Sequence, residues 1–168
     1  VLPLWVADMD FMTAQPIIDA LQARAAEGIW GYTSRPDSYF EAVRDWQRDR
    51  NGWTPDTKLM SHALGVVPAL SALVRLFTQK DDGVLIMTPV YSEFYDVVQA
   101  WDRRVVESPL LYQNGLWQID FDDFARRLAD VRMFLLCSPH NPVGRVWTHE
   151  ELSQMLALCK QAGVLVVS

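Results

Sequence analysis

Residues 133–144 read MFLLCSPHNPVG, and this stretch decides the fold. It opens with a continuous apolar run of strand length, which is typical of a strand buried on both faces of a sheet. Two prolines and a glycine follow it directly. A residue fixed between prolines, as Asn141 is, can direct its amide at one ligand atom with little entropic cost. The alternative is that the prolines and Gly144 only build a tight turn.

Apolar runs of the same kind occur on either side of this stretch. Those at 84–87, 105–106 and 164–167 predict further strands, and the patterns at 91–100 and 148–161 predict helices between them. Continuous apolar strands that alternate with amphipathic helices predict an α/β fold. We therefore expect a mostly parallel sheet with helices on both faces.

The first half of the chain is dominated by helical signals. Residues 13–27 begin with a hydroxyl residue, carry a proline in the first turn and end before Gly28. A second helix is expected to begin after Pro36-Asp37 and to end at Asn51-Gly52. A third is expected from Val66 to about Gln79, with one apolar stripe made by Leu70, Leu73, Val74 and Phe77. The sequence contains no internal repeat and no stretch typical of a flexible linker.

Composition excludes several classes of function. The formal charge of −6 disfavours nucleic acid as a partner, and no apolar run is long enough to cross a membrane. We expect a cytoplasmic location, because no signal peptide opens the chain. The two cysteines, Cys137 and Cys159, lie in apolar patterns and predict buried thiols rather than a disulfide framework. The three histidines have no metal-ligand spacing, so no metal site is expected.

Two more candidate motifs follow predicted strands. Ligands gather at the carboxyl ends of parallel strands. A predicted strand runs through Gly65 into a helix at Val66 and Val67, and free N–H groups at such a helix start can hold a phosphate. The alternative is a purely structural junction. Tyr91 follows the run at 84–87 and could cover one face of a flat cofactor ring. The alternative is a core aromatic packed with its neighbours.

The loop at 138–144 resembles the Asn-Pro-x-Gly loop of class I/II aminotransferases, which are pyridoxal 5′-phosphate (PLP) enzymes of fold type I. The resemblance implies that Asn141 hydrogen-bonds the phenolic oxygen of PLP. It also implies that Tyr91 stacks on the pyridine ring, and that Gly65, Val66 and Val67 hold the phosphate.

The opening residues narrow the branch. Residues 4–11, LWVADMDF, are similar to the signature of MalY/PatB-type cystathionine β-lyases, which implies that Ala7 and Asp8 contact the substrate. Gly31-Tyr32 also matches, at the place where that branch uses a tyrosine from the neighbouring subunit to contact the cofactor phosphate. The resemblance therefore implies a homodimer with shared active sites and a small amino-acid substrate.

Family members are more than twice as long as this chain of 168 residues. We expect a fragment, with an N-terminal arm at 1–12 and the first part of the PLP-binding large domain at 13–168. The resemblance implies that the catalytic lysine belongs to the other half, so these residues alone are expected to be inactive. Lys58, Lys80 and Lys160 are interpreted as surface residues.

The function implied for the intact protein is a PLP-dependent carbon–sulfur lyase. Such an enzyme eliminates a thiol from cystathionine or a related cysteine S-conjugate and yields pyruvate and ammonia. Three alternatives remain open: an aminotransferase that uses the same cofactor site, a non-enzymatic regulatory protein of the same fold, and a nucleotide-binding α/β protein. The last lacks a glycine-rich fingerprint.

Overall fold

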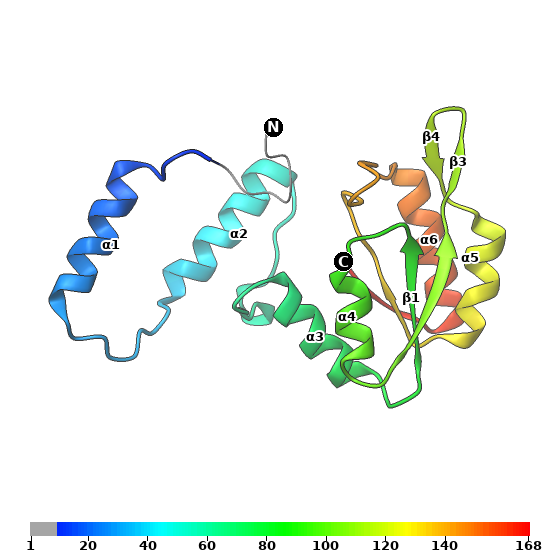
Figure 1. Cartoon of the computed structure of the whole chain (residues 1–168), viewed down its shortest axis with the longest axis horizontal. Helices are drawn as coiled ribbons and strands as arrows, with labels where there is room; N and C mark the ends of the chain where they lie inside the picture. The colour runs from blue at the N-terminus through cyan, green and yellow to red at the C-terminus, as the bar shows by residue number, and fades with distance from the viewer. Residues whose placement is uncertain (1–9) are drawn as a thin grey trace. The chain divides into compact units, whose positions relative to one another are not determined.

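The computed structural model describes residues 10–168, and the chain divides into two compact units, Val1–Met60 and Ser61–Ser168. Figure 1 shows the elements of each unit. The predicted domain boundary after residue 12 stays a prediction. The two units are described separately below.

The described part of the first unit, residues 10–60, contains two helices, which confirms both sequence predictions for this region. They are α1 (Gln15–Glu27) and α2 (Asp37–Asn51), and the short 3₁₀ turn η1 (Thr57–Leu59) follows them. Each helix ends at a glycine in the left-handed region, with φ of 66° at Gly28 and 67° at Gly52. Neither helix has a buried side chain among the described residues.

The second unit is built on a four-stranded sheet in the order β2-β1-β5-β6, and every pairing in it is parallel. The strands are β1 (Gly83–Thr88), β2 (Arg104–Pro109), β5 (Met133–Leu135) and β6 (Leu165–Val167). Each of the four contains or lies within an apolar run of the sequence, although β2 extends well beyond Val105-Val106. The predicted parallel sheet is therefore confirmed.

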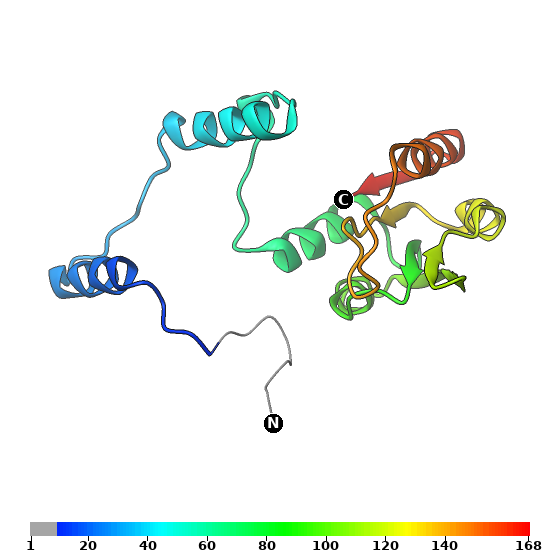
Figure 2. The same ribbon diagram turned by 90° about the horizontal axis from the view of Figure 1, so that it is seen from above.

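Helices cover both faces of this sheet, as Figure 2 shows end-on. Helices α3 (Val66–Phe77) and α4 (Glu93–Gln99) lie on one face. The other face is covered by α5 (Phe121–Arg127) and α6 (His149–Ala162), with the 3₁₀ turn η2 (Leu128–Asp130) between them in the chain. The predicted α/β class is confirmed, because each strand run is separated from the next by helical chain.

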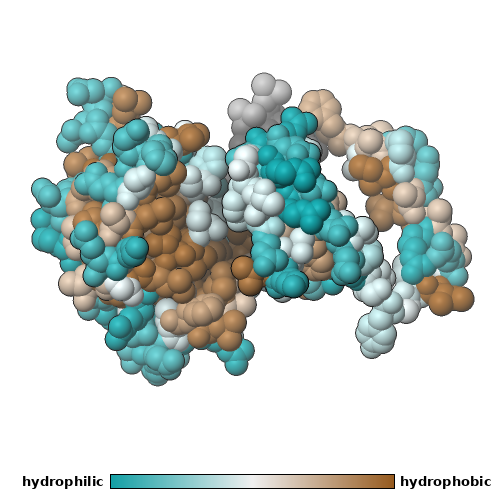
Figure 3. All heavy atoms as spheres, turned by 180° about the vertical axis from the view of Figure 1, so that it is seen from behind, coloured by the Kyte–Doolittle hydropathy of each residue, from teal (hydrophilic) through white to brown (hydrophobic). Residues whose placement is uncertain are grey.

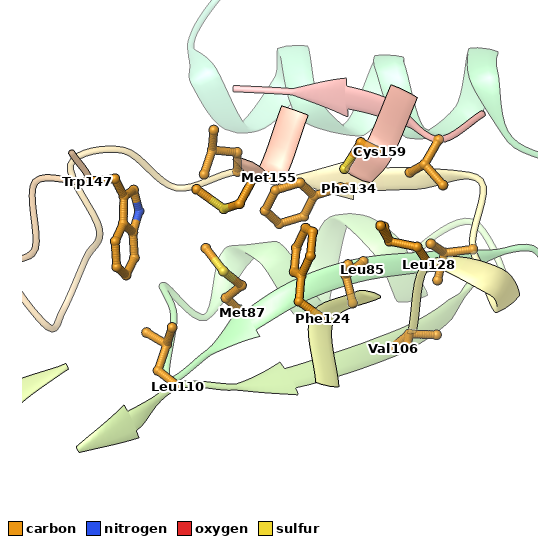
Figure 4. Close-up of a cluster of buried hydrophobic side chains, with 13 residues drawn as sticks. Leu85, Met87, Val106, Leu110, Phe124, Leu128, Phe134, Trp147, Met155 and Cys159 are labelled. Carbon is orange, nitrogen blue, oxygen red and sulfur yellow. The ribbon is translucent and has the colours of Figure 1, made fainter. Parts of the chain in front are cut away.

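Two apolar layers form the core, one on each face of the sheet. Strand β1 serves both layers by strict alternation: Val84 and Ile86 pack with α3 and α4, and Leu85 and Met87 pack with α5 and α6. Phe124 and Phe134 meet edge to face at 5.0 Å in the second layer, which Figure 4 shows in close-up. The rigid sheet so formed fixes the loops at its edges.

The structure corrects three details of the sequence analysis. Residues 61–64 form no strand, so helix α3 follows an extended segment rather than a strand. Phe77, expected in the buried stripe of that helix, is 59% exposed. A hairpin of β3 (Leu111–Gln113) and β4 (Leu116–Gln118) was not predicted. Its signal is the dipeptide Asn114-Gly115, which takes positive φ at both positions and is typical of a tight hairpin turn.

The second unit also carries an extensive apolar surface on the face shown in Figure 3. Its exposed large apolar side chains include Leu64, Val66, Leu76, Phe77, Val146 and Leu165. Apolar surface of this extent is typical of contact with further protein. Among the described residues, no helix has the length and hydropathy needed to cross a membrane.

Candidate functional site

The candidate site is built on two neighbouring strands that end at the same edge of the sheet. Strands β1 and β5 pair in parallel, with Val84 opposite Met133 and Leu85 opposite Phe134. The loop after β1 carries Tyr91, and the loop after β5 carries Asn141. The carboxyl ends of parallel strands are where ligands of α/β proteins bind.

A buried histidine connects the two loops. The ring of His140 is 1% exposed, and its Nε2 lies 3.0 Å from the carbonyl oxygen of Pro89, two residues before Tyr91. Its ring edge meets Trp147 at 5.3 Å, and the Trp147 indole N–H donates to the Cys137 oxygen at the end of β5. The two loops are therefore held against each other by side chains that lie beneath their exposed surface.

Asn141 lies on the exposed side of its loop. Its backbone N–H donates to the Cys137 sulfur at 3.3 Å, which fixes the main chain. Its side-chain amide has no hydrogen-bond partner within residues 10–168. An amide with a fixed backbone and free donor and acceptor atoms is well placed to bind a ligand.

Tyr91 is also exposed. Its side chain is 43% accessible, whereas its neighbour Phe94 is 8% exposed and packs into the core. Within the described residues, Tyr91 therefore does not lie in the buried core. Its backbone oxygen accepts the N–H of Phe94 at 3.0 Å, so the start of α4 holds the ring position.

The start of α3 supplies backbone donors. Helix α3 connects to β1 by only five residues, 78–82, so it runs against that strand and brings its first turn toward the carboxyl edge. The N–H groups of Val66 and Val67 have no acceptor within residues 10–168, and no side chain caps the helix. A Cβ added at Gly65 would meet only the Pro68 ring, at 3.6 Å, so packing within the described chain leaves room there.

The three sequence motifs share one apolar layer. Val67, Val90 and Cys137, one from each motif, pack against the buried cluster between the sheet and the helices α3 and α4. Distant segments of the chain are thus joined through common core side chains. The segments that carry Gly65, Tyr91 and Asn141 therefore all border this apolar layer.

Burial controls the titration of two side chains near these loops. Desolvation lowers the pKa of His140, although the carbonyls of Pro89, Cys137 and Met87 favour its charged form. The ring is therefore neutral at pH 7, and its Nε2 donates to the Pro89 oxygen. Burial, and then the nearby Glu107 carboxylate, raise the pKa of Tyr95 in α4.

Sequence reasoning missed two supporting residues. His140 was treated only as a histidine without metal-ligand spacing. Arg145 also supports the loop, because its guanidinium donates to the Trp117 oxygen at 2.8 Å and forms two bonds to Glu151, at 2.6 and 2.7 Å. The available signal was that both residues lie in or directly after the proline-rich loop, where a polar side chain that becomes buried needs a hydrogen-bond partner.

Other predicted residues lie elsewhere. Ala7 and Asp8 fall outside the described residues. Tyr32 belongs to the first unit and is fully exposed. The lysines 58, 80 and 160 are exposed, as expected.

A hollow of about 740 Å³ opens at the opposite, amino-terminal edge of the sheet, beside Gly83, Arg104 and Arg132. It is remote in the fold from the loops after β1 and β5, and the carboxyl edge is the one where α/β proteins place their chemistry.

Comparison with known proteins identifies the family. The family model of class I and II aminotransferases matches residues 1–168. The chain belongs to this family. It is 43% identical over 169 residues to cystathionine β-lyase PatB of Bacillus subtilis (strain 168), a match that covers 99% of this chain and 44% of PatB. The chain therefore spans less than half the length of that relative.

Two solved structures are similar to the chain. A PLP-bound putative aminotransferase from Clostridium difficile 630 has a TM-score of 0.90 and 43% identity, over 98% of this chain and 43% of that one. A PLP-bound carbon–sulfur lyase from Staphylococcus hominis has a TM-score of 0.88 and 35% identity, over 96% of this chain and 43% of that one. Both relatives carry PLP.

Proposed function

We propose that the intact protein is a PLP-dependent carbon–sulfur lyase that acts on cystathionine or a related cysteine S-conjugate. One observation carries the proposal: the exposed Tyr91 and the unpartnered amide of Asn141 follow adjacent parallel strands, in a chain 43% identical to the lyase PatB. The reaction consumes water and releases a thiol, pyruvate and ammonia.

The described residues fit the cofactor. PLP is a flat ring with a phenolic oxygen and an anionic phosphate, and it withdraws electrons from the α-carbon of a bound amino acid. Such a group requires a flat apolar partner, a directed hydrogen bond and an anion site. Tyr91 offers the flat apolar face, Asn141 the directed hydrogen bond, and the first turn of α3 the anion site.

Each residue then has a separate role. The free N–H groups of Val66 and Val67 bind the phosphate at the positive end of α3, and Gly65 leaves space for its approach. Tyr91 covers one face of the ring and excludes water from it. Asn141 binds the phenolic oxygen through its amide. Ala7 and Asp8 contact the amino-acid substrate.

We propose further that the protein is a homodimer with shared sites, in which Tyr32 reaches the phosphate bound by the partner subunit. The support is the full exposure of Tyr32, in a unit where helix α2 exposes Tyr39 and Trp46. Aromatic residues of this kind are enriched where two protein surfaces meet.

An aminotransferase is the second candidate, because the similar structure from Clostridium difficile 630 is described as a putative aminotransferase. Both activities use the same ring, phosphate and phenolic-oxygen contacts, so the described residues support both. They differ in what happens after the α-proton is removed.

A product assay on the full-length protein separates the two. Incubation with cystathionine and added PLP, without any keto acid, should release pyruvate and homocysteine in equal amounts. Conversion of an added keto acid to its amino acid, with no homocysteine or pyruvate released from cystathionine, would favour the aminotransferase. The absence of both reactions over a panel of amino acids would contradict enzymatic function.

A further inference from the structure

His140 is buried between exposed neighbours. Pro139 and Asn141 are both exposed, whereas His140 is 1% exposed. Its main chain is fixed on both sides, because its N–H donates to the Arg145 oxygen and its own oxygen accepts the Gly144 N–H, each at 2.8 Å. The residue is therefore an anchor within the loop, and the exposed Asn141 is attached directly to it.

The side chain of His140 makes the bond that crosses to the second loop. A carbonyl oxygen only accepts, so Nε2 carries the proton in the 3.0 Å contact to Pro89. Pro89 and His140 are 51 positions apart in the chain. This bond therefore fixes the loop of Tyr91 relative to the loop of Asn141.

Simple space filling does not account for a histidine here. Its Nδ1 is buried without a hydrogen-bond partner within the described residues, which costs stability. A phenylalanine would keep the edge-on contact to Trp147 and leave no buried polar atom. Compared with such a ring, histidine adds the donor at Nε2.

We propose that His140 is a positioning residue that sets the separation of Asn141 from Tyr91 through its hydrogen bond to the Pro89 carbonyl. It deepens the proposed function, on which it rests, because these two residues bind the same cofactor ring from different loops. His140 itself does not touch the cofactor. It acts by fixing the position of the Asn141 amide relative to Tyr91.

The first test uses full-length protein freed of PLP, so that it does not depend on the cofactor assignment. His140→Phe removes the donor and keeps a ring, and His140→Gln restores an N–H donor near the Nε2 position. The exposed His149 serves as the matched control, as His149→Phe. Amide hydrogen exchange is measured over residues 88–92 and 138–145.

We expect faster exchange in both segments for His140→Phe, exchange near that of the wild type for His140→Gln, and no local change for His149→Phe. Equal exchange in the Phe and Gln variants, or a change confined to one segment, would overturn the proposal. If His140→Phe fails to fold, His140→Asn takes its place, because its shorter amide does not reach Pro89. The exchange of the Asn variant is then compared with that of His140→Gln in the same two segments.

The second test uses the PLP-loaded protein. His140→Phe should shift the pH titration of the visible absorbance in the direction that Asn141→Ala shifts it, and should add nothing in an Asn141→Ala background. Additive shifts would show that His140 acts independently of Asn141 and would overturn the proposal. If the wild-type protein shows no visible PLP absorbance, the proposed function is contradicted. The hydrogen-exchange experiment then tests the role of His140 by itself.

Discussion

At the scale of the residue, the candidate site has two kinds of side chain: exposed ones, which are proposed to contact a ligand, and buried ones, which hold the loops in place. Tyr91 and Asn141 are exposed and make few contacts within the chain, whereas His140 and Trp147 are buried beneath them. A rigid buried support lowers the entropy that an exposed group loses on binding. Changes in the exposed pair should therefore alter binding with little effect on stability.

Asn141→Ala in the intact protein should leave PLP bound but change its visible absorbance and the pH dependence of that absorbance. The substitution removes one hydrogen bond to the phenolic oxygen, worth about 0.5–1.5 kcal/mol, which alters the charge distribution of the ring. A spectrophotometric titration measures the change. An unaltered titration would argue against the assigned contact.

Cys159 in α6 should destabilise the fold in alkali. Burial raises the pKa of its thiol to about 11 from an ordinary value near 9, so the unfolded chain loses this proton first as the pH rises. The free energy of unfolding is therefore unaffected by this thiol below pH 9 and decreases between pH 9 and 11. The decrease is about 2 kcal/mol at pH 10.5. Urea unfolding at pH 8 and 10.5 measures the loss, and Cys159→Ala should reduce the difference by this amount.

At the scale of the element, helix starts in the second unit differ in a way that matches the site. Helix α5 is capped by the Asp120 side chain, and α6 begins with a reciprocal capping box between Thr148 and Glu151. Helix α3 has no side-chain cap, and Gly65 precedes it. Helices α5 and α6, on one face of the sheet, are closed by their own side chains, while α3 and α4, on the other face, have no side-chain cap.

Thr148→Ala should lower the free energy of unfolding of the intact protein by about 1 kcal/mol, because the Thr148 oxygen accepts the Glu151 N–H and no other group replaces it. Chemical denaturation measures the effect. The matched control is Thr13→Ala, since Thr13 precedes α1 without capping it. A loss equal to that of the control would show that the box contributes nothing.

At the scale of the whole molecule, the two units differ in how their apolar side chains are used. The second unit buries two apolar layers against its sheet, whereas the helices of the first expose residues such as Trp46. Exposed aromatic residues at this density favour contact with another protein surface. This agrees with the proposed dimer.

Tyr32→Phe in the full-length protein should weaken PLP binding several-fold and leave the dimer intact, because only the hydroxyl bond to the phosphate is lost. PLP affinity is measured by titration of the apoprotein, and assembly by sedimentation. Tyr39→Phe, a second exposed tyrosine of the same unit, is the control. An active monomer, or unchanged affinity in the Tyr32 variant, would refute the shared site.

The sequence by itself determined most of the elements and the loops that carry the proposed chemistry. Strands such as β1 are visible as apolar runs, and the loop at 138–144 as a spacing of prolines and glycine, because both patterns are local in the chain. The sheet order, the exposure of Phe77 and the buried bond from His140 to Pro89 were decided by the tertiary structure. All three depend on which segments pack side by side although they lie tens of residues apart in the chain. A local sequence pattern does not specify that packing.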